Sequence, residues 1–110
     1  MPSSQDDFAT LMEQARAGSQ SALRDLVSKY GAHVLRVVRQ KLNKALRPKF
    51  DSQDFVQAVW ASFFAVLPDR YSFDRPEDLV ALLTEMARNK VVDAVRQRLL
   101  TQKYNVSRER

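Results

Sequence analysis

The sequence predicts an all-α fold, organised as a compact bundle of about four helices. Apolar residues recur at intervals of three and four positions over most of the chain. Helix-breaking residues are few, with two glycines and four prolines in 110 residues, and the alternation typical of strands never persists. A chain of this length fits one domain with a single modest core, so we expect residues 1–110 to form one helical domain.

The first predicted helix covers about Asp7–Ala17 and follows a flexible start over residues 1–6. Gly18 is a suitable stop, because glycine readily adopts the left-handed conformation at the end of a helix. Ser19 or Ser21 can cap the next helix. The first helix is short, so it needs a partner against which to pack.

The second predicted helix has an apolar stripe that extends from Leu23 to Leu46, and Pro48 ends it, because proline lacks the backbone N–H that a helix interior requires. This helix is also basic. The segment Ser28–Phe50 contains seven lysines and arginines and no acidic residue. Such a run is typical of a solvated helix face, but it also suits a surface that binds nucleic acid.

The third predicted helix begins at Asp51, whose side chain is a good amino-terminal cap, and ends at Pro68. Its apolar residues form a broad aromatic stripe, most of which we expect in the core. They are Phe55, Val56, Val59, Trp60, Phe63, Phe64 and Leu67. A polar loop interrupted by two aromatic residues, Asp69–Arg75, follows.

The fourth predicted helix starts near Pro76, which forfeits no hydrogen bond in a first turn, and Asp74 with Glu77 has the spacing of a capping box. We expect it to continue to Leu100 or beyond, and residues 101–110 to form a frayed, basic end. One side of this helix gathers apolar residues that should pack inward. They are Leu79, Leu83, Ala87, Val91, Ala94 and Val95.

The opposite side of the fourth helix combines cations with an amide within about a third of the circumference. These residues are Arg88, Asn89, Val92 and Arg96, joined by Lys103 if the helix continues that far. Guanidinium and ammonium groups suit phosphates, whereas the Asn89 amide can both donate to and accept from a base edge. A soluble helix that shows its polar face to water is the alternative interpretation.

Composition and net charge limit the classes of protein to which the chain can belong. The net charge is +5 and the pI is near 9.9, which favours an anionic partner. The absence of cysteine excludes a disulfide framework and a thiolate metal site. Neither an export signal nor an apolar run of about 18 residues occurs. We therefore expect a cytoplasmic protein without membrane insertion.

No catalytic constellation is visible in the sequence. His33 is the only histidine and has no second ligand at metal-binding spacing, so we expect a surface or packed histidine. Most carboxylates start helices or face cationic neighbours, and neither a glycine-rich phosphate loop nor a serine elbow occurs. The sequence predicts a protein that is not an enzyme and that needs no cofactor or metal.

Two segments resemble sigma factors of bacterial RNA polymerase, in particular region 2 of the extracytoplasmic-function (ECF) subfamily. Met86–Arg98 is similar to the family pattern in which Ala-Arg-Asn is followed by Asp and then a basic cluster. Asp51–Trp60 is similar to the family's polymerase-binding helix, with an acidic start, then Asp, two apolar residues and Gln. The resemblance covers most of Leu11–Arg98 and implies a region 2 fold and a role in transcription initiation.

The resemblance implies a first binding face that docks the third helix on the largest-subunit coiled coil of core RNA polymerase. The matching positions are Asp54 and Gln57. The next position is often Glu in the family but is Ala58 here, which removes one expected charged contact. Helix capping alone is the alternative role of Asp54, because acids in a first turn stabilise any helix.

The second implied face reads the promoter minus-ten element on the non-template strand. The matching residues are Tyr71, Phe73, Arg75, Arg88, Asn89, Val92 and Arg96. A base turned out of its stack can be stacked on an aromatic ring and hydrogen-bonded along its edge. Tyr71 or Phe73 can equally be a hydrophobic plug that seats the loop.

Two further interpretations stay open. The bundle can be a protein-interaction module covered by a helical regulator, and the family implies an anti-sigma factor as that partner. It can also be a general basic DNA-binding bundle unrelated to transcription initiation. The family usually adds a helix-turn-helix domain that reads the minus-thirty-five element. Nothing after Arg98 is long enough to supply one, so we expect a fragment.

Overall fold

The computed structural model describes residues 4–42, 46–70, 73 and 75–108, and within them it contains helices and no strand. The α-helices are α1 (Ser4–Arg16), α2 (Gln20–Lys41), α3 (Ser52–Arg70) and α4 (Pro76–Arg108), and a 3-10 turn, η1, covers Arg47–Lys49. The predicted all-α bundle of about four helices is confirmed.

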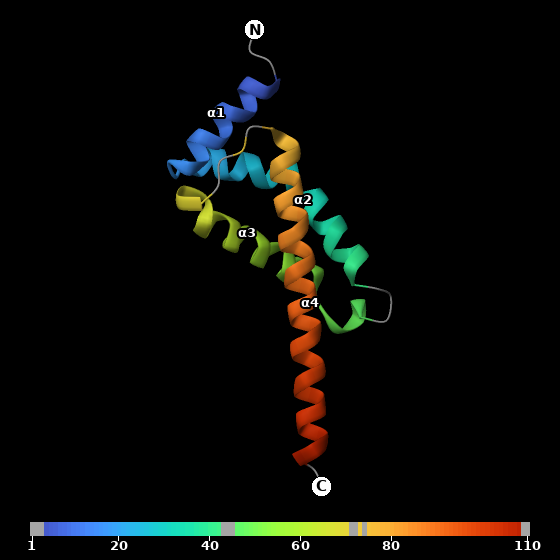
Figure 1. The fold of residues 1–110 in the computed structure, drawn as a ribbon. Helices are drawn as coiled ribbons and strands as arrows, with labels where there is room; N and C mark the ends of the chain where they lie inside the picture. The colour runs from blue at the N-terminus through green and yellow to red at the C-terminus, as the bar shows by residue number, and fades with distance from the viewer. Residues whose placement is uncertain (1–3, 43–45, 71–72, 74, 109–110) are drawn as a thin grey trace.

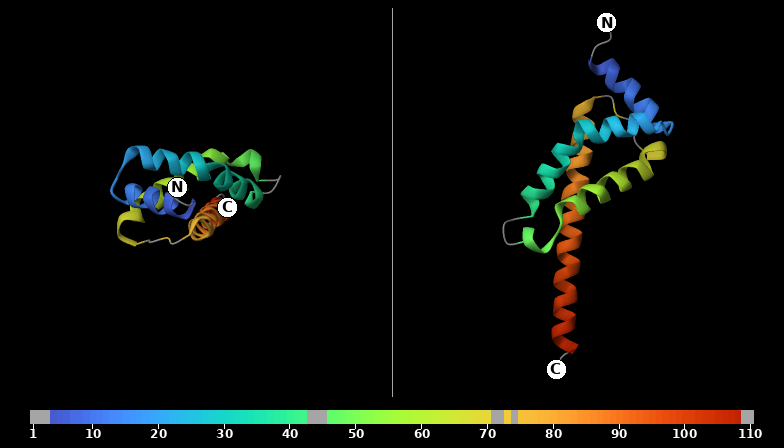
Figure 2. Two further views of the ribbon diagram at one scale, coloured as in Figure 1. Left: turned by 90° about the horizontal axis from the view of Figure 1, so that it is seen from above. Right: turned by 180° about the vertical axis from the view of Figure 1, so that it is seen from behind.

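Helices α2, α3 and α4 all contact one another, and α1 packs against α2 (Figure 1). The molecule is elongated, with extents of 68 × 27 × 20 Å. Its radius of gyration is 17.1 Å, compared with about 13 Å for a compact domain of this length. The difference arises because the carboxyl-terminal part of α4 continues as a single rod beyond the bundle (Figures 1 and 2).

The core contains the apolar faces that the helical periodicity predicted. On α4, the inward-facing residues are buried as far as Val91, and Ala94 and Val95 are partly buried against the same core. On α3, Trp60 and Phe63 are buried and Phe64 packs beside them. The largest fully buried side chains are Phe8, Phe63, Leu26, Leu42, Leu67, Leu79 and Leu83. Packing of α4 against α2 and α3 therefore fixes which side of α4 meets solvent.

Helix ends in three places follow the expected residues. Gly18 has a φ of 93°, the left-handed conformation that ends α1. Of the two candidate serines, Ser19 caps α2, since its hydroxyl oxygen accepts from the Ala22 N–H at 3.3 Å. The Asp51 carboxylate accepts from the Gln53 N–H at 2.9 Å at the start of α3. The cap predictions at these positions are confirmed.

The end of α2 differs from the prediction: the helix ends at Lys41 and not near Leu46. The chain leaves the helix at Leu42, which is extended, and Pro48 lies inside η1. Arg47 folds back on the end of α2. Its guanidinium donates to the Arg39 carbonyl at 2.9 Å and to the Leu42 carbonyl at 3.0 Å. The Arg47 side chain thus donates to backbone carbonyls that have no partner within the helix. Its positive charge is also stabilised by the negative, carboxyl-terminal end of the helix dipole.

Two other predicted boundaries, the start of α1 and the end of α3, were also wrong. α1 begins at Ser4, inside the segment expected to be flexible. α3 continues through Pro68 to Arg70. A proline this close to a helix end removes a single hydrogen bond, and its fixed φ is itself helical. The expectation that the fourth helix continues to Leu100 or beyond is confirmed, since α4 extends to Arg108. The predicted capping box at Asp74 lies outside the described residues.

Candidate functional site

The outward side of α4 presents the cations and the amide that the sequence singled out. Arg88, Asn89 and Arg96 are exposed, and Val92 between them is partly buried. The buried side chains of Ala87 and Val91 hold this stretch against the core. The side chain of Lys103 lies outside the described residues. Three polar groups on one side of a rigid helix can contact a single extended ligand.

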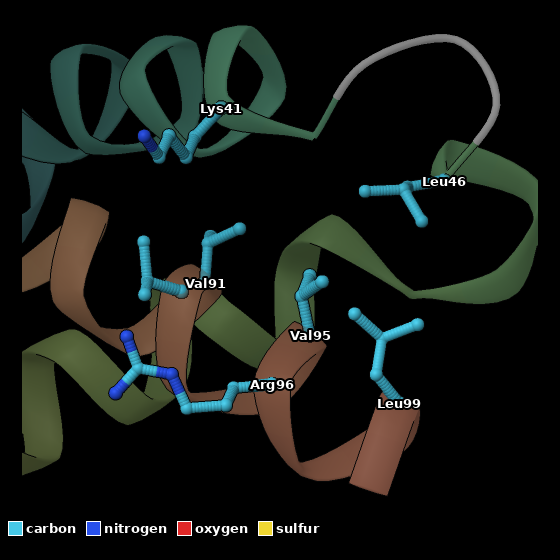
Figure 3. A pocket seen from close by; sticks show the side chains of 7 residues that line it. Lys41, Leu46, Val91, Val95, Arg96 and Leu99 are labelled. Atoms are coloured by element: carbon cyan, nitrogen blue, oxygen red, sulfur yellow. The ribbon is translucent and has the colours of Figure 1, made fainter. Parts of the chain in front are cut away.

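A groove of about 310 Å³ runs beside this surface, between the end of α2 and the middle of α4. Its lining residues are Lys41, Leu46, Val91, Val92, Val95, Arg96 and Leu99. The charged ends of Lys41 and Arg96 lie at one end of the groove, and Leu46 and Leu99 lie at the other (Figure 3). The volume is at the lower end of ligand pockets. The groove can therefore accept a small, weakly polar group that is attached to an anion.

Phe73, in the segment before α4, is partly buried rather than presented to solvent. Its ring centroid lies 6.2 Å from that of Phe63, and it lines a hollow of about 350 Å³ together with Met12 of α1. Of the two roles open to Phe73, this geometry favours the plug that seats the loop. Tyr71, for which the same two roles are open, lies outside the described residues.

Arg75 is exposed and forms an ion pair with Asp78 at 3.6 Å, one turn into α4. Exposed pairs of this kind contribute at most about 1 kcal/mol, so the guanidinium can exchange its partner for a phosphate. Arg75 precedes Arg88 by thirteen residues, which corresponds to about 20 Å along a helix. The structure therefore does not bring Arg75 together with the Arg88–Arg96 surface, and a ligand that touches both must be extended.

The first turns of α3 expose Asp54 and Gln57. Residues three apart on a helix share a face, so the two side chains are neighbours. The capping bond at this end uses the Asp51 carboxylate, and no hydrogen bond of the described residues uses the carboxylate of Asp54. The negative charge of Asp54 is still stabilised by the positive, amino-terminal end of the helix dipole. Ala58, where the family often has Glu, is partly buried.

A link between α2 and α4 was not predicted from the sequence. His33 Nε2 lies 2.7 Å from Thr84 Oγ1, and the Thr84 hydroxyl donates to the Val80 carbonyl at 2.8 Å. Both bonds are satisfied when Nε2 carries the proton and donates to Thr84. His33 is thus a packed histidine, one of its two expected roles. No local pattern could have shown this pair, because its members are 51 positions apart.

Within the described ranges, no group of three or more His, Cys, Asp or Glu residues could hold a metal ion. Burial, and to a lesser extent the charge of Glu77, raises the pKa of the Tyr30 hydroxyl above its ordinary value, so Tyr30 stays neutral. Among the helices described, none combines the length and the apolar character that crossing a membrane requires.

Comparison with known proteins assigns the chain to a family. No curated protein and no solved structure shows significant similarity to it. The family model described as ECF sigma factor matches residues 5–104, which include nearly all of α1, the whole of α2 and α3, and most of α4. The match therefore spans both the α3 surface at Asp54 and the α4 surface at Asn89. The chain belongs to the ECF sigma factor family, whose members are transcription initiation factors.

Proposed function

We propose that this domain binds core RNA polymerase through the start of α3 and recognises the promoter minus-ten element on the non-template strand through α4. The observation that carries the proposal is the exposure of Arg88, Asn89 and Arg96 on one side of a helix anchored in the core. The domain carries out no reaction and works in the cytoplasm, where it helps polymerase to open the DNA.

The proposed contacts divide into charge and base recognition. Arg88 and Arg96 neutralise phosphates, which positions the strand without reading its sequence. The Asn89 amide reads a base edge, since it offers both a donor and an acceptor. A base turned out of the stack enters the groove beside Val92, with its phosphate near Lys41 and Arg96. These contacts require separated strands, so they stabilise the opened state selectively.

The segment before α4 holds the other end of the strand. Arg75 contacts a phosphate after it leaves Asp78, Tyr71 stacks on a base, and Phe73 seats the segment on Phe63 and α1. The separation of about 20 Å between Arg75 and Arg88 equals at most about six nucleotide steps, the number at the 3.4 Å rise of a stacked strand, and fewer steps in a strand whose bases are turned out. One strand can therefore contact both places in a single pass.

A selection experiment tests base recognition and does not require the promoter sequence. The chain is mixed at low salt with single-stranded DNA randomised at six consecutive positions, and bound and input pools are sequenced. We expect enrichment of particular bases at neighbouring positions, because Asn89 discriminates between base edges. A bound pool with the composition of the input pool would remove base recognition and leave a general DNA-binding bundle.

Docking on polymerase is tested by Asp54→Arg. We expect this change to lower recovery of core polymerase in a pull-down at least tenfold, because it places a cation where the partner surface accommodates a carboxylate. Gln57→Ala should lower recovery by a smaller factor, since it removes only a neutral hydrogen-bonding group. Asp25→Arg, the same charge change at an exposed position of α2, is the matched control. Equal recovery from all four proteins would exclude this docking surface.

An anti-sigma factor that covers the same domain is a second proposed partner. Leu99 and Leu100 are 60% and 56% exposed on the projecting part of α4, and Leu99 lines the groove. Exposed leucines next to an apolar groove are typical of surfaces that accept an amphipathic helix. A helical regulator bound there would compete with the promoter strand for Val92 and Arg96.

A further inference from the structure

A second basic surface lies on α2 and η1, outside the contacts proposed above. Arg36, Arg39 and Arg47 line a groove of about 360 Å³, whose other lining residues are Ala32, Leu35 and Gln40. Arg36, Arg39 and Arg47 are exposed, and the chain has no acidic residue between Ser28 and Phe50. Within the described ranges the ion pair found is that of Arg75 with Asp78. The three guanidinium groups therefore keep their charge available for an anionic ligand.

This surface is continuous with the one on α4. Gln40 also lines a neighbouring groove of about 300 Å³ together with Val37, Lys41 and Arg88. Lys41 in turn lines the groove that contains Arg96. The three grooves share lining residues and lie side by side. The cations along them form a surface that we call the cationic track: Arg36, Arg39, Arg47, Lys41, Arg88 and Arg96.

Arg47 gives the α2 end of the cationic track a fixed geometry. Its Nε and Nη2 donate to the carbonyls of Arg39 and Leu42, at 2.9 to 3.3 Å. These bonds hold the guanidinium beside Arg39, and its Nη1 takes no part in them. A positioned guanidinium loses little conformational entropy when it binds a phosphate, and its planar fork can contact two oxygens at once.

We propose that the α2 end of the cationic track binds the phosphate backbone of duplex DNA that continues from the opened segment. The location rests on the proposed function, which puts the opened strand at Arg88 and Arg96. The adjoining backbone then passes over Arg36, Arg39 and Arg47. A duplex fits because its phosphates repeat at a regular, dense spacing. An acidic protein helix would need a broader apolar contact than Leu35 and Ala32 provide.

The number of phosphate contacts can be obtained from how steeply the DNA-binding affinity falls as the salt concentration rises. The test DNA is a duplex joined to a single-stranded overhang of one fixed sequence, and the affinity of the full chain for it is measured from low to moderate salt. Each phosphate neutralised on duplex DNA contributes about 0.9 to the slope of log K against log salt. Arg36→Gln with Arg39→Gln should therefore lower the slope by about 1.8 and weaken binding most strongly at low salt.

A matched variant separates local contacts from net charge. Arg16→Gln with Arg24→Gln removes the same charge from exposed positions on α1 and the first half of α2, and should leave the slope unchanged. Equal slopes for the two double variants would overturn the proposal, as would undetectable binding of the unchanged chain at low salt. Competition by polyglutamate that equals competition by duplex DNA would also overturn it, since the track would then select acidic protein.

Failure of this duplex-binding proposal can be distinguished from failure of the proposed minus-ten recognition. Arg36→Gln with Arg39→Gln should leave binding of the single-stranded oligonucleotide alone within twofold of the unchanged chain. If base selection fails while the duplex slope still falls, the cationic track stands as a DNA-binding surface and the minus-ten assignment does not. If base selection succeeds while the duplex slope is unchanged, the minus-ten assignment stands and the cationic track is excluded.

Discussion

Replacing Asn89 and Arg96 together by alanine is expected to reduce promoter opening by core polymerase about a hundredfold. A good side-chain contact to a base edge is worth about 1–3 kcal/mol, and the lost phosphate contact adds to it. A combined loss of about 2.8 kcal/mol corresponds to a factor of 100, because each 1.4 kcal/mol is tenfold. Both residues are exposed, so folding stability should change by less than about 0.5 kcal/mol for each.

Opening can be measured as permanganate reactivity of thymines, on a promoter that carries the selected sequence. Lys90→Ala with Gln97→Ala is the matched control, because it also removes one cation and one amide from α4. Lys90 follows Asn89 in the sequence, and Gln97 follows Arg96. Each control position therefore lies about 100° around the helix from the neighbouring residue whose contact is tested. The proposed contacts would be excluded if Asn89→Ala with Arg96→Ala opened DNA as well as this control, with both proteins shown to be folded.

Replacing Phe63 by alanine is expected to have the largest effect on stability, about 3–5 kcal/mol of the free energy of unfolding. Phe63 is fully buried, and its ring centroid lies 6.0 Å from that of Trp60 and 5.7 Å from that of Phe64. It also supports Phe73. A domain of this size has about 5–15 kcal/mol in total, so the variant should unfold at much lower temperature and urea concentration.

Trp60 is the only tryptophan and contacts Phe63 edge to face, so its fluorescence reports this unfolding directly. Phe64→Ala is the control from the same cluster. Its side chain is partly exposed, so less apolar area is lost and the cost should be less than half as large. Equal destabilisation by the two changes would show that Phe63 is not the centre of the aromatic core.

Most of the fold could be predicted because helical periodicity is a local property. The spacing of Leu79, Leu83 and Ala87 predicts which side of α4 faces the core. The same helical geometry places Arg88 and Asn89 on the side that faces solvent. Helix ends were harder where they depend on a distant group. The end of α2 depends on Arg47 folding back to the Arg39 carbonyl, which no pattern in the helix itself contains.

The candidate site could be predicted only in part, for a related reason. The exposed residues of α4 follow from the sequence, but the groove beside them needs Lys41 and Leu46 from a different part of the chain. The same holds for Phe73, for which the sequence left two roles open. Its contact with Phe63 is tertiary, and this contact distinguishes a seated plug from a ring presented to a base.

The central claim is that the exposed side of α4 meets the unpaired promoter strand. Amide chemical shifts of the isotopically labelled chain, titrated with the selected single-stranded oligonucleotide, test it most directly. The account predicts that the largest shift changes fall within residues 88–96 and that a scrambled oligonucleotide causes much smaller ones. Equal changes with both oligonucleotides, or changes confined to α1 and the first half of α2, would contradict it.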